Sequence, residues 1–243
     1  WIDVGRLTTV LHGVYSYGRD VESRDAALKA GLAAAGAGSA LTGNTACEKW
    51  GLVRHPPTIP ALIEVATPTG QVAVHQGRSP AMRNCQVKVV HRSFGPGDIR
   101  TVDGLDLLEP VLSLIDFAVV ASERDVRFAF LEACRLNFFR QADVRRCYEQ
   151  MHGRRGATKL RPSLSLWVPE LNRTKSVFEG RVVLDLVWLE CPLPLVNVKV
   201  HGFEVDLYWP GQRFALELDG GAYHSDPVQK KIDLEKQRFL ERQ

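Results

Sequence analysis

Hydrophobic and polar residues change their spacing several times along the chain, and each change predicts a different element. Alternation or short apolar runs between turn residues predict a hairpin and three further strands, at 5–18, 62–66, 71–74 and 86–91. Helical spacing between capping and glycine signals predicts helices at 25–35, 42–50, 109–120, 122–136, 141–152, 176–190 and 228–243. Residues 153–169, rich in glycine, arginine and proline, are expected to form a linker. The mixture predicts an α/β (α+β) fold.

The clearest alternation lies in residues 202–219, where it predicts two strands joined by a turn at Trp209–Arg213. One face of this hairpin is apolar and carries Phe203, Val205, Leu207, Trp209, Phe214, Leu216 and Leu218. The other face is acidic and carries Glu204, Asp206, Glu217 and Asp219. A turn centred after Gly211 places Asp206 opposite Glu217, and Glu204 opposite Asp219.

Four carboxylates on one hairpin face need an explanation, because like charges directly opposed at about 5 Å destabilise a strand pair. A bound divalent cation would neutralise them, since Mg²⁺ prefers carboxylate and water oxygens. A half-solvated hairpin shows the same alternation of acidic and apolar residues, and a one-residue bulge would break the pairing. The pattern leaves both interpretations open, a metal site and a solvated acidic face.

Composition narrows the class of protein. With 243 residues, of which 45% are hydrophobic, the chain can bury a core and is expected to hold two domains. No apolar run approaches the roughly 20 residues of a membrane span, and no signal peptide is visible, so no membrane partner is expected. The five cysteines include no CxxC pair, which favours a reducing, cytoplasmic location over a disulfide framework or structural zinc. Because the chain begins at Trp1, we expect it to be a fragment or to start where order starts.

Positive charge is concentrated in one segment, although the net charge is only +3. Residues 124–161 contain ten Arg and Lys residues against four acidic ones. Such an excess suits a phosphate backbone, and it predicts DNA contacts at Arg145, Arg146, Arg154, Arg155 and Lys159. Solvated helix faces are often basic as well, so a solvated surface without a nucleic-acid role stays open as the alternative.

The C-terminal third carries four motifs in a fixed order. They are SVFE at Ser176–Glu179, P-x-x-N-x-x-V-x-G-x-E-V-D at Pro194–Asp206, WP at Trp209–Pro210, and E-L-D-G-x-x-Y-H at Glu217–His224. This order resembles a family of uncharacterised bacterial domains related to the very-short-patch-repair endonucleases. That family belongs to the PD-(D/E)xK, or restriction-endonuclease-like, class. The resemblance implies such a domain over 166–243.

The resemblance also implies roles for individual residues. Asp206 and Glu217 would be the ligands of Mg²⁺ (or Mn²⁺), assisted by the backbone carbonyl of Leu218. His224 would be the general acid or base, and Glu179 would reach toward the metal through water. Two of these residues also have purely local explanations. Glu179 completes a capping box with Ser176, and His224 follows a turn.

The match departs from the class in two respects. Asp219 occupies the position of the usual catalytic lysine, and His224 would have to compensate for that loss. The family pattern also continues into a further strand and helix, so the domain is expected to be incomplete at its C-terminal end.

Looser motifs upstream resemble AbiEi-like antitoxins. The wing of their winged-helix domain resembles Val10–Tyr15 (VLHGVY), and further matches follow at Leu41–Leu52, His91–Ser93 and Asp103–Asp116. The resemblance implies a wing remnant at 1–20 and an α/β middle domain at 21–160. It also implies a cognate toxin as a possible partner.

Two functions follow from these patterns. The first is a Mg²⁺-dependent DNA endonuclease or nickase. The second is an AbiEi-like DNA-binding regulator or antitoxin that keeps a degenerate, non-catalytic nuclease fold. The third alternative is an interaction module without a nucleic-acid role. The sequence leaves the oligomeric state open.

Overall fold

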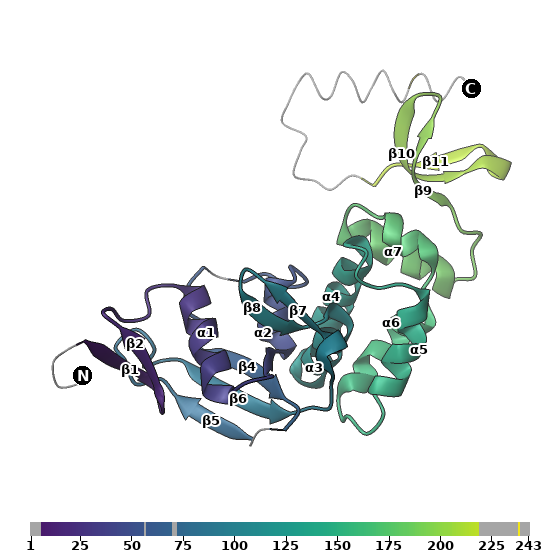
Figure 1. Cartoon of the computed structure of the whole chain (residues 1–243). Coiled ribbons are helices and arrows are strands. Elements are labelled where there is room, and N and C mark those ends of the chain that lie inside the picture. Colours follow the sequence, from purple (N-terminus) through teal and green to yellow (C-terminus); the bar gives the residue numbers. More distant parts are fainter. Residues whose placement is uncertain (1–5, 56, 70–71, 219–237, 239–243) are drawn as a thin grey trace.

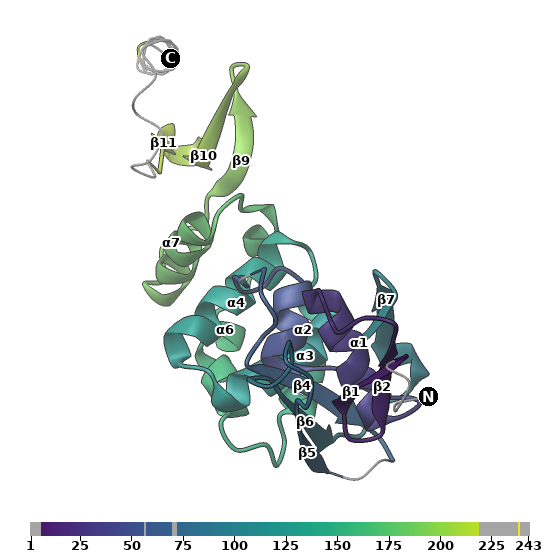
Figure 2. The same ribbon diagram turned by 90° about the vertical axis from the view of Figure 1, so that its left-hand side faces the viewer.

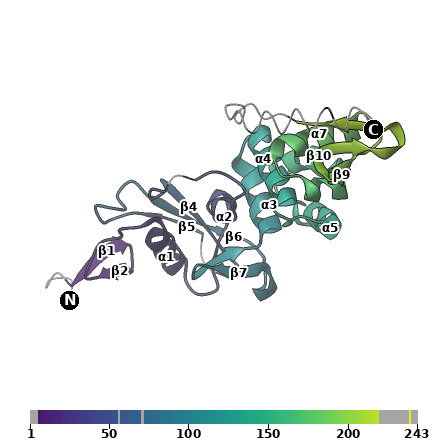
Figure 3. The ribbon, with the colours of Figure 1, turned by 90° about the horizontal axis from the view of Figure 1, so that it is seen from above.

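The computed structural model describes residues 6–55, 57–69, 72–218 and 238. These residues form a mixed α and β structure, as the sequence predicts. In Figure 1 a six-stranded sheet with its helices lies at one end, a group of helices lies in the middle, and a three-stranded sheet lies at the other end. Figure 3 shows the N-terminal hairpin and the three-stranded sheet at opposite ends of an elongated molecule.

The six-stranded sheet is built from both parallel and antiparallel pairs in the order β5-β6-β4-β3-β8-β7. Its strands are β3 (Ala40–Leu41), β4 (Leu62–Thr67), β5 (Ala73–Gln76), β6 (Gln86–His91), β7 (Ile99–Val102) and β8 (Leu105–Leu108). The predicted strands at 62–66 and 86–91 are confirmed, whereas β5 begins two residues later than predicted. This edge strand has alternating half-buried and exposed residues, so its ends are weakly marked in the sequence.

Helices α1 (Arg24–Ala35) and α2 (Gly43–Lys49) confirm the two predicted N-terminal helices. A Cβ atom added at Gly31 of α1 would lie 3.0 Å from Ile63, whereas the neighbouring residue Glu64 accepts a hydrogen bond from Asn44 of α2. Because successive strand residues point to opposite faces, α1 and α2 cover opposite sides of β4. The predicted hairpin is also present, as β1 (Leu7–Leu11) and β2 (Val14–Tyr17).

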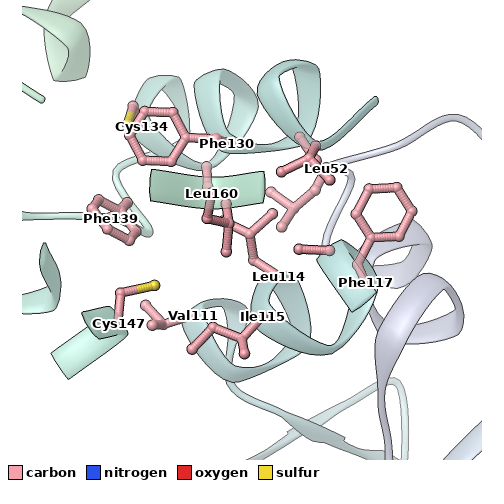
Figure 4. Packing of buried hydrophobic residues seen from close by; sticks show 14 of the residues in the cluster. Leu52, Val111, Leu114, Ile115, Phe117, Phe130, Cys134, Phe139, Cys147 and Leu160 are labelled. Carbon is pink, nitrogen blue, oxygen red and sulfur yellow. The ribbon is translucent and has the colours of Figure 1, made fainter. Parts of the chain in front are cut away.

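Helices α3 (Pro110–Val120), α4 (Glu123–Arg135), α5 (Gln141–Gln150) and α6 (Arg161–Ser165) form the middle of the molecule. The three longer ones were predicted, and Ser122 caps α4 by accepting a hydrogen bond from the backbone N–H of Asp125. Their buried side chains meet in one apolar cluster, in which the rings of Phe130 and Phe139 pack edge to face at 5.1 Å (Figure 4).

The prediction of a linker at 153–169 is wrong. Residues Ala157–Leu160 form a 3₁₀ turn that leads directly into α6, and Ala157, Leu160 and Leu164 are buried in the apolar cluster. Gly156 is required by geometry, because its φ is +89° and an added Cβ would lie 2.5 Å from the carbonyl oxygen of Val119. Glycine and proline here mark a tight turn and a helix start instead of a flexible connection.

Helix α7 (Val177–Trp188) confirms the predicted helix at 176–190. It precedes the three-stranded antiparallel sheet of β9 (Leu195–Val200), β10 (Phe203–Trp209) and β11 (Phe214–Leu216). In Figure 2 this sheet stands away from the six-stranded sheet, beyond α7. Short 3₁₀ turns connect other elements at Pro96–Asp98, Pro169–Arg173 and Pro210–Gln212.

The predicted register of the β10–β11 hairpin is confirmed for the three residue pairs that the ladder contains. Leu207 pairs with Leu216, Tyr208 with Ala215, and Trp209 with Phe214. The apolar face is partly covered, because Val205 and Leu207 are fully buried while Phe214 is 52% exposed. The predicted helix at 228–243 falls outside the described residues, apart from residue 238, which is helical.

Candidate functional site

Asp206 lies half-buried in β10, the middle strand of the three-stranded sheet. Its Oδ2 oxygen accepts a hydrogen bond from the backbone N–H of Leu218 at 2.8 Å. The hairpin ladder ends at Leu207 and Leu216, and the same register carried one residue further sets Asp206 opposite Glu217. Leu218 therefore contacts Asp206 through its amide, whereas the resemblance implied a contribution from its carbonyl.

Glu179 lies in the first turn of α7 and is 7% exposed. Its Oε1 accepts a hydrogen bond from the Ser176 hydroxyl at 2.8 Å, and its backbone N–H donates to the same hydroxyl at 3.1 Å. Its Oε2 accepts from the backbone N–H of Lys175 at 2.8 Å. The predicted cap of α7 by Ser176 is confirmed, but the reciprocal half of the capping box differs, because the Glu179 carboxylate accepts from the backbone N–H of Lys175 and not from that of Ser176.

Asn197 connects Glu179 to the sheet, and the sequence motifs gave it no role. Its Nδ2 donates to Glu179 Oε2 at 2.7 Å and to the carbonyl oxygen of Arg173 at 2.9 Å. The β9–β10 ladder pairs Val198 with Val205 and Val196 with Leu207, so Asn197 is set opposite Asp206, where the ladder is interrupted. The backbone of Asn197 is left-handed there, with φ of +51°. The available signal was the motif at Pro194–Asp206, in which Asn197 is one of the matching letters.

The Oδ1 oxygen of Asn197 is buried and accepts no hydrogen bond from the described part of the chain. Buried acceptors are nearly always satisfied, so this oxygen needs a partner. Asn197 is set opposite Asp206 on the adjacent strand. The Oδ1 oxygen of Asp206 also accepts no hydrogen bond from a described residue, since only its Oδ2 is bonded, to the backbone N–H of Leu218. Two oxygen donors on facing positions of adjacent strands fit a hard cation such as Mg²⁺, which combines few protein ligands with water.

Glu204, which the sequence placed on the same acidic face as Asp206, lies beside lysines and not beside other carboxylates. It stands opposite Lys199 on β9 and forms an ion pair with Lys175. Two lysines thus offset its charge, and the expected repulsion on this face is reduced.

The described residues supply an incomplete ligand set. Within residues 6–55, 57–69, 72–218 and 238, no three His, Cys, Asp or Glu side chains are grouped to hold a metal. Asp219 and His224, the other two predicted catalytic residues, lie outside the described residues. Glu217 is described and exposed, at the end of the hairpin next to Leu218.

Three of the five predicted DNA-contacting residues have internal partners. Arg146 pairs with Asp98 at 2.7 Å and with Glu109. Arg154 donates to Asp116 at 2.6 Å, and Lys159 donates to the carbonyl oxygen of Ala121 at 2.6 Å. Arg145 and Arg155 are exposed. Arg146, Arg154 and Lys159 therefore bind groups at or near the ends of α3 and within it.

Asp116 is the centre of this internal network. Its Oδ1 accepts from Arg92 and Arg154, both at 2.6 Å, and its Oδ2 accepts from the Thr42 hydroxyl at 2.6 Å. Arg92 is 1% exposed, and burial, partly offset by Asp116, lowers its pKa to about 10. The network joins α2, α3, the end of β6 and the segment after α5.

Comparison with known proteins identifies no relative: no family model matches the chain, and neither a curated protein nor a solved structure matches it. None of the described helices is long and apolar enough to cross a membrane.

Proposed function

We propose that this chain is a DNA-acting protein whose C-terminal region is a restriction-endonuclease-like domain that nicks or cleaves DNA with Mg²⁺ (or Mn²⁺). The observation that carries the proposal is the row Glu179, Asn197 and Asp206, which runs from the first turn of α7 onto two adjacent strands. The buried Oδ1 of Asn197 accepts no hydrogen bond from a described residue, and Asn197 is set opposite Asp206 on the adjacent strand, which supports a cation at this point.

In this proposal Asp206 and Glu217 hold the cation, with the carbonyl of Leu218 as a further ligand. A bound cation activates water and stabilises charge on a phosphate. The chain's own part is to fix the geometry: Leu218 N–H holds one oxygen of Asp206, and Asn197 holds Glu179. His224 transfers the proton, as an imidazole titrating near neutrality can, and Asp219 occupies the position of the missing lysine.

The alternative is an AbiEi-like DNA-binding regulator or antitoxin that acts with a cognate toxin and keeps this fold without catalysis. Specific observations favour it. Both carboxylate oxygens of Glu179 already accept hydrogen bonds from protein groups, so this residue has a complete structural role. Arg146, Arg154 and Lys159 also pair internally, which leaves fewer basic groups to deliver a substrate.

Cleavage of supercoiled plasmid in Mg²⁺ or Mn²⁺ tests the proposal. We expect wild type to produce nicked plasmid and Asp206→Ala to produce none above background. The matched control is Glu204→Gln, which removes a carboxylate from the same sheet face at a residue paired with Lys175, and it should retain nicking. Nicking by Asp206→Ala at the wild-type rate would contradict the proposal. Salt-sensitive DNA binding without cleavage would support the regulator.

A further inference from the structure

A second surface lies where α7 meets α3 and α4. The C-terminal end of α3 and the N-terminal halves of α4 and α7 enclose an open groove of about 1250 Å³. Figures 1 and 2 show α4 and α7 side by side. Besides the buried Phe117, the groove is lined by four arginines and two exposed phenylalanines, namely Arg54, Arg124, Arg127, Arg181, Phe128 and Phe178.

Electrostatics give the groove a positive field. All four arginines are exposed, and none forms an ion pair with another described residue. Asp125 is the one acidic residue in the described lining, and it accepts a hydrogen bond from the Ser122 hydroxyl at 2.6 Å as part of the α4 cap. The arginines therefore outnumber the acids of the groove lining by three and form no ion pair with a described carboxylate, which suits an anionic ligand.

The two phenylalanines are the second feature. Phe128 is 38% exposed and Phe178 is 49% exposed, although each sits on a helix whose other face is buried. The α4–α7 contact is closely packed beneath them, since a Cβ added at Gly180 would lie 3.0 Å from Leu131. Rings presented to solvent beside arginines offer flat surfaces for stacking, and arginine itself stacks on planar groups.

We propose that this groove binds a single-stranded segment of nucleic acid. The arginines contact its phosphates and the phenylalanines stack on its bases. This combination is what sequence-tolerant binding of single strands requires. A duplex keeps its bases stacked inside and cannot reach Phe128 and Phe178. The inference deepens the proposed function, on which it rests for the class of ligand, because α7 carries both the groove and Glu179.

A neighbouring cavity limits the path that the nucleic-acid strand can take. A smaller cavity of about 250 Å³ shares Arg127 and Arg181 but adds Glu123 and Asp185. These carboxylates would repel phosphates, so the strand should run along the side of Arg54 and Arg124. Glu123→Gln is therefore expected to leave affinity unchanged or raise it slightly.

Fluorescence anisotropy with a fluorescein-labelled 15-nucleotide oligo-dT tests the inference, in EDTA so that cleavage and metal binding do not contribute. We expect wild type to bind, and Arg127→Ala/Arg181→Ala to weaken binding at least tenfold, with a salt slope shallower by about two. Phe128→Ala/Phe178→Ala should weaken binding by a similar factor through lost stacking. The matched control is Arg19→Ala/Arg83→Ala, which removes two exposed arginines from the six-stranded-sheet end and should bind like wild type.

Three further measurements separate the groove from the metal site and single strands from duplex DNA and acidic peptides. Asp206→Ala should bind oligo-dT as wild type does, so failure of the metal site and failure of the groove give different results. No oligo-dT binding by wild type, or equal binding by the groove variants, would overturn the inference. Equal affinity for a 15-base-pair duplex, or displacement by a poly-glutamate peptide at equal concentration, would also overturn it. Unchanged thermal unfolding of the phenylalanine variants, expected from their exposure, shows that the fold is intact.

Discussion

At the scale of single residues, Asn197 is the least expected part of the candidate site. It lies in a left-handed backbone conformation that asparagine tolerates better than most residues, with φ of +51°. Its amide donates to Glu179 in the first turn of α7, and Asn197 itself is set opposite Asp206 on the adjacent strand. The residue therefore helps to fix where α7 meets the three-stranded sheet, and the proposed cation site depends on that position.

Replacing Asn197 with alanine should destabilise the protein. The change removes the hydrogen bond to the buried Glu179 carboxylate and the one to Arg173, a loss of about 2–3 kcal/mol beyond backbone strain. Asn137→Ala is the matched control, because Asn137 has a similar φ of +59° but is exposed. Urea unfolding measures both variants, and equal losses of stability would show that Asn197 contributes only its backbone conformation.

Glu64 is a second residue whose environment has a measurable consequence. It is 8% exposed, and burial raises the pKa of its carboxyl above the ordinary 4.5, although the hydrogen bond from Asn44 N–H opposes this. An acid with a raised folded-state pKa binds more protons in the folded than in the unfolded state. Its contribution is therefore fully present below pH 4.5 and is lost as pH rises through the folded pKa.

The variant Glu64→Gln should remove this dependence. From pH 4.5 upward, the free energy of unfolding of wild type should fall relative to that of the variant, and the difference should level off above the folded pKa. Urea unfolding across pH 4.5–8 measures the effect. Glu149→Gln, at an exposed position, serves as the control and should run parallel to wild type. A difference between wild type and Glu64→Gln that stays constant with pH would contradict the account.

At the scale of elements, local signals predicted most helices and the decisive hairpin, because caps and alternation act within a few residues. Ser122 and Ser176 cap α4 and α7, and Leu207 pairs with Leu216 in the predicted register. The prediction of a linker at 153–169 is wrong because glycine and proline, here Gly156 and Pro162, occur both in flexible linkers and in packed turns. Only the distant Val119, which Gly156 approaches, distinguishes the two.

Two glycines in this segment provide a direct test. At Gly156 an alanine would combine a left-handed φ with a Cβ 2.5 Å from the Val119 carbonyl oxygen, and it should cost more than 3 kcal/mol of stability. At Gly153, where φ is +73° and nothing lies within 4 Å, alanine should cost about 1 kcal/mol. Urea midpoints compare them. Equal midpoints would mean that the segment is not docked against α3.

At the scale of the whole molecule, the sequence predicted the hairpin of the candidate site but not the contacts between parts. The hydrogen bond from the backbone N–H of Leu218 to Asp206 was not predicted, and the internal pairing of Arg146 and Arg154 depends on Asp98 and Asp116. These partners lie 38 or more residues away in the chain, beyond the reach of spacing arguments. The same limit hid the groove between α4 and α7, whose arginines come from three separate segments.

The central claim is that Asp206 holds a divalent cation, and binding of Mn²⁺ tests it most directly. Electron paramagnetic resonance reports free Mn²⁺ in solution, so titration gives the bound amount. We predict one Mn²⁺ per wild-type chain, displaced by excess Mg²⁺, unchanged in Glu204→Gln and lost in Asp206→Ala. No binding by wild type, or equal binding by Asp206→Ala, would contradict the claim.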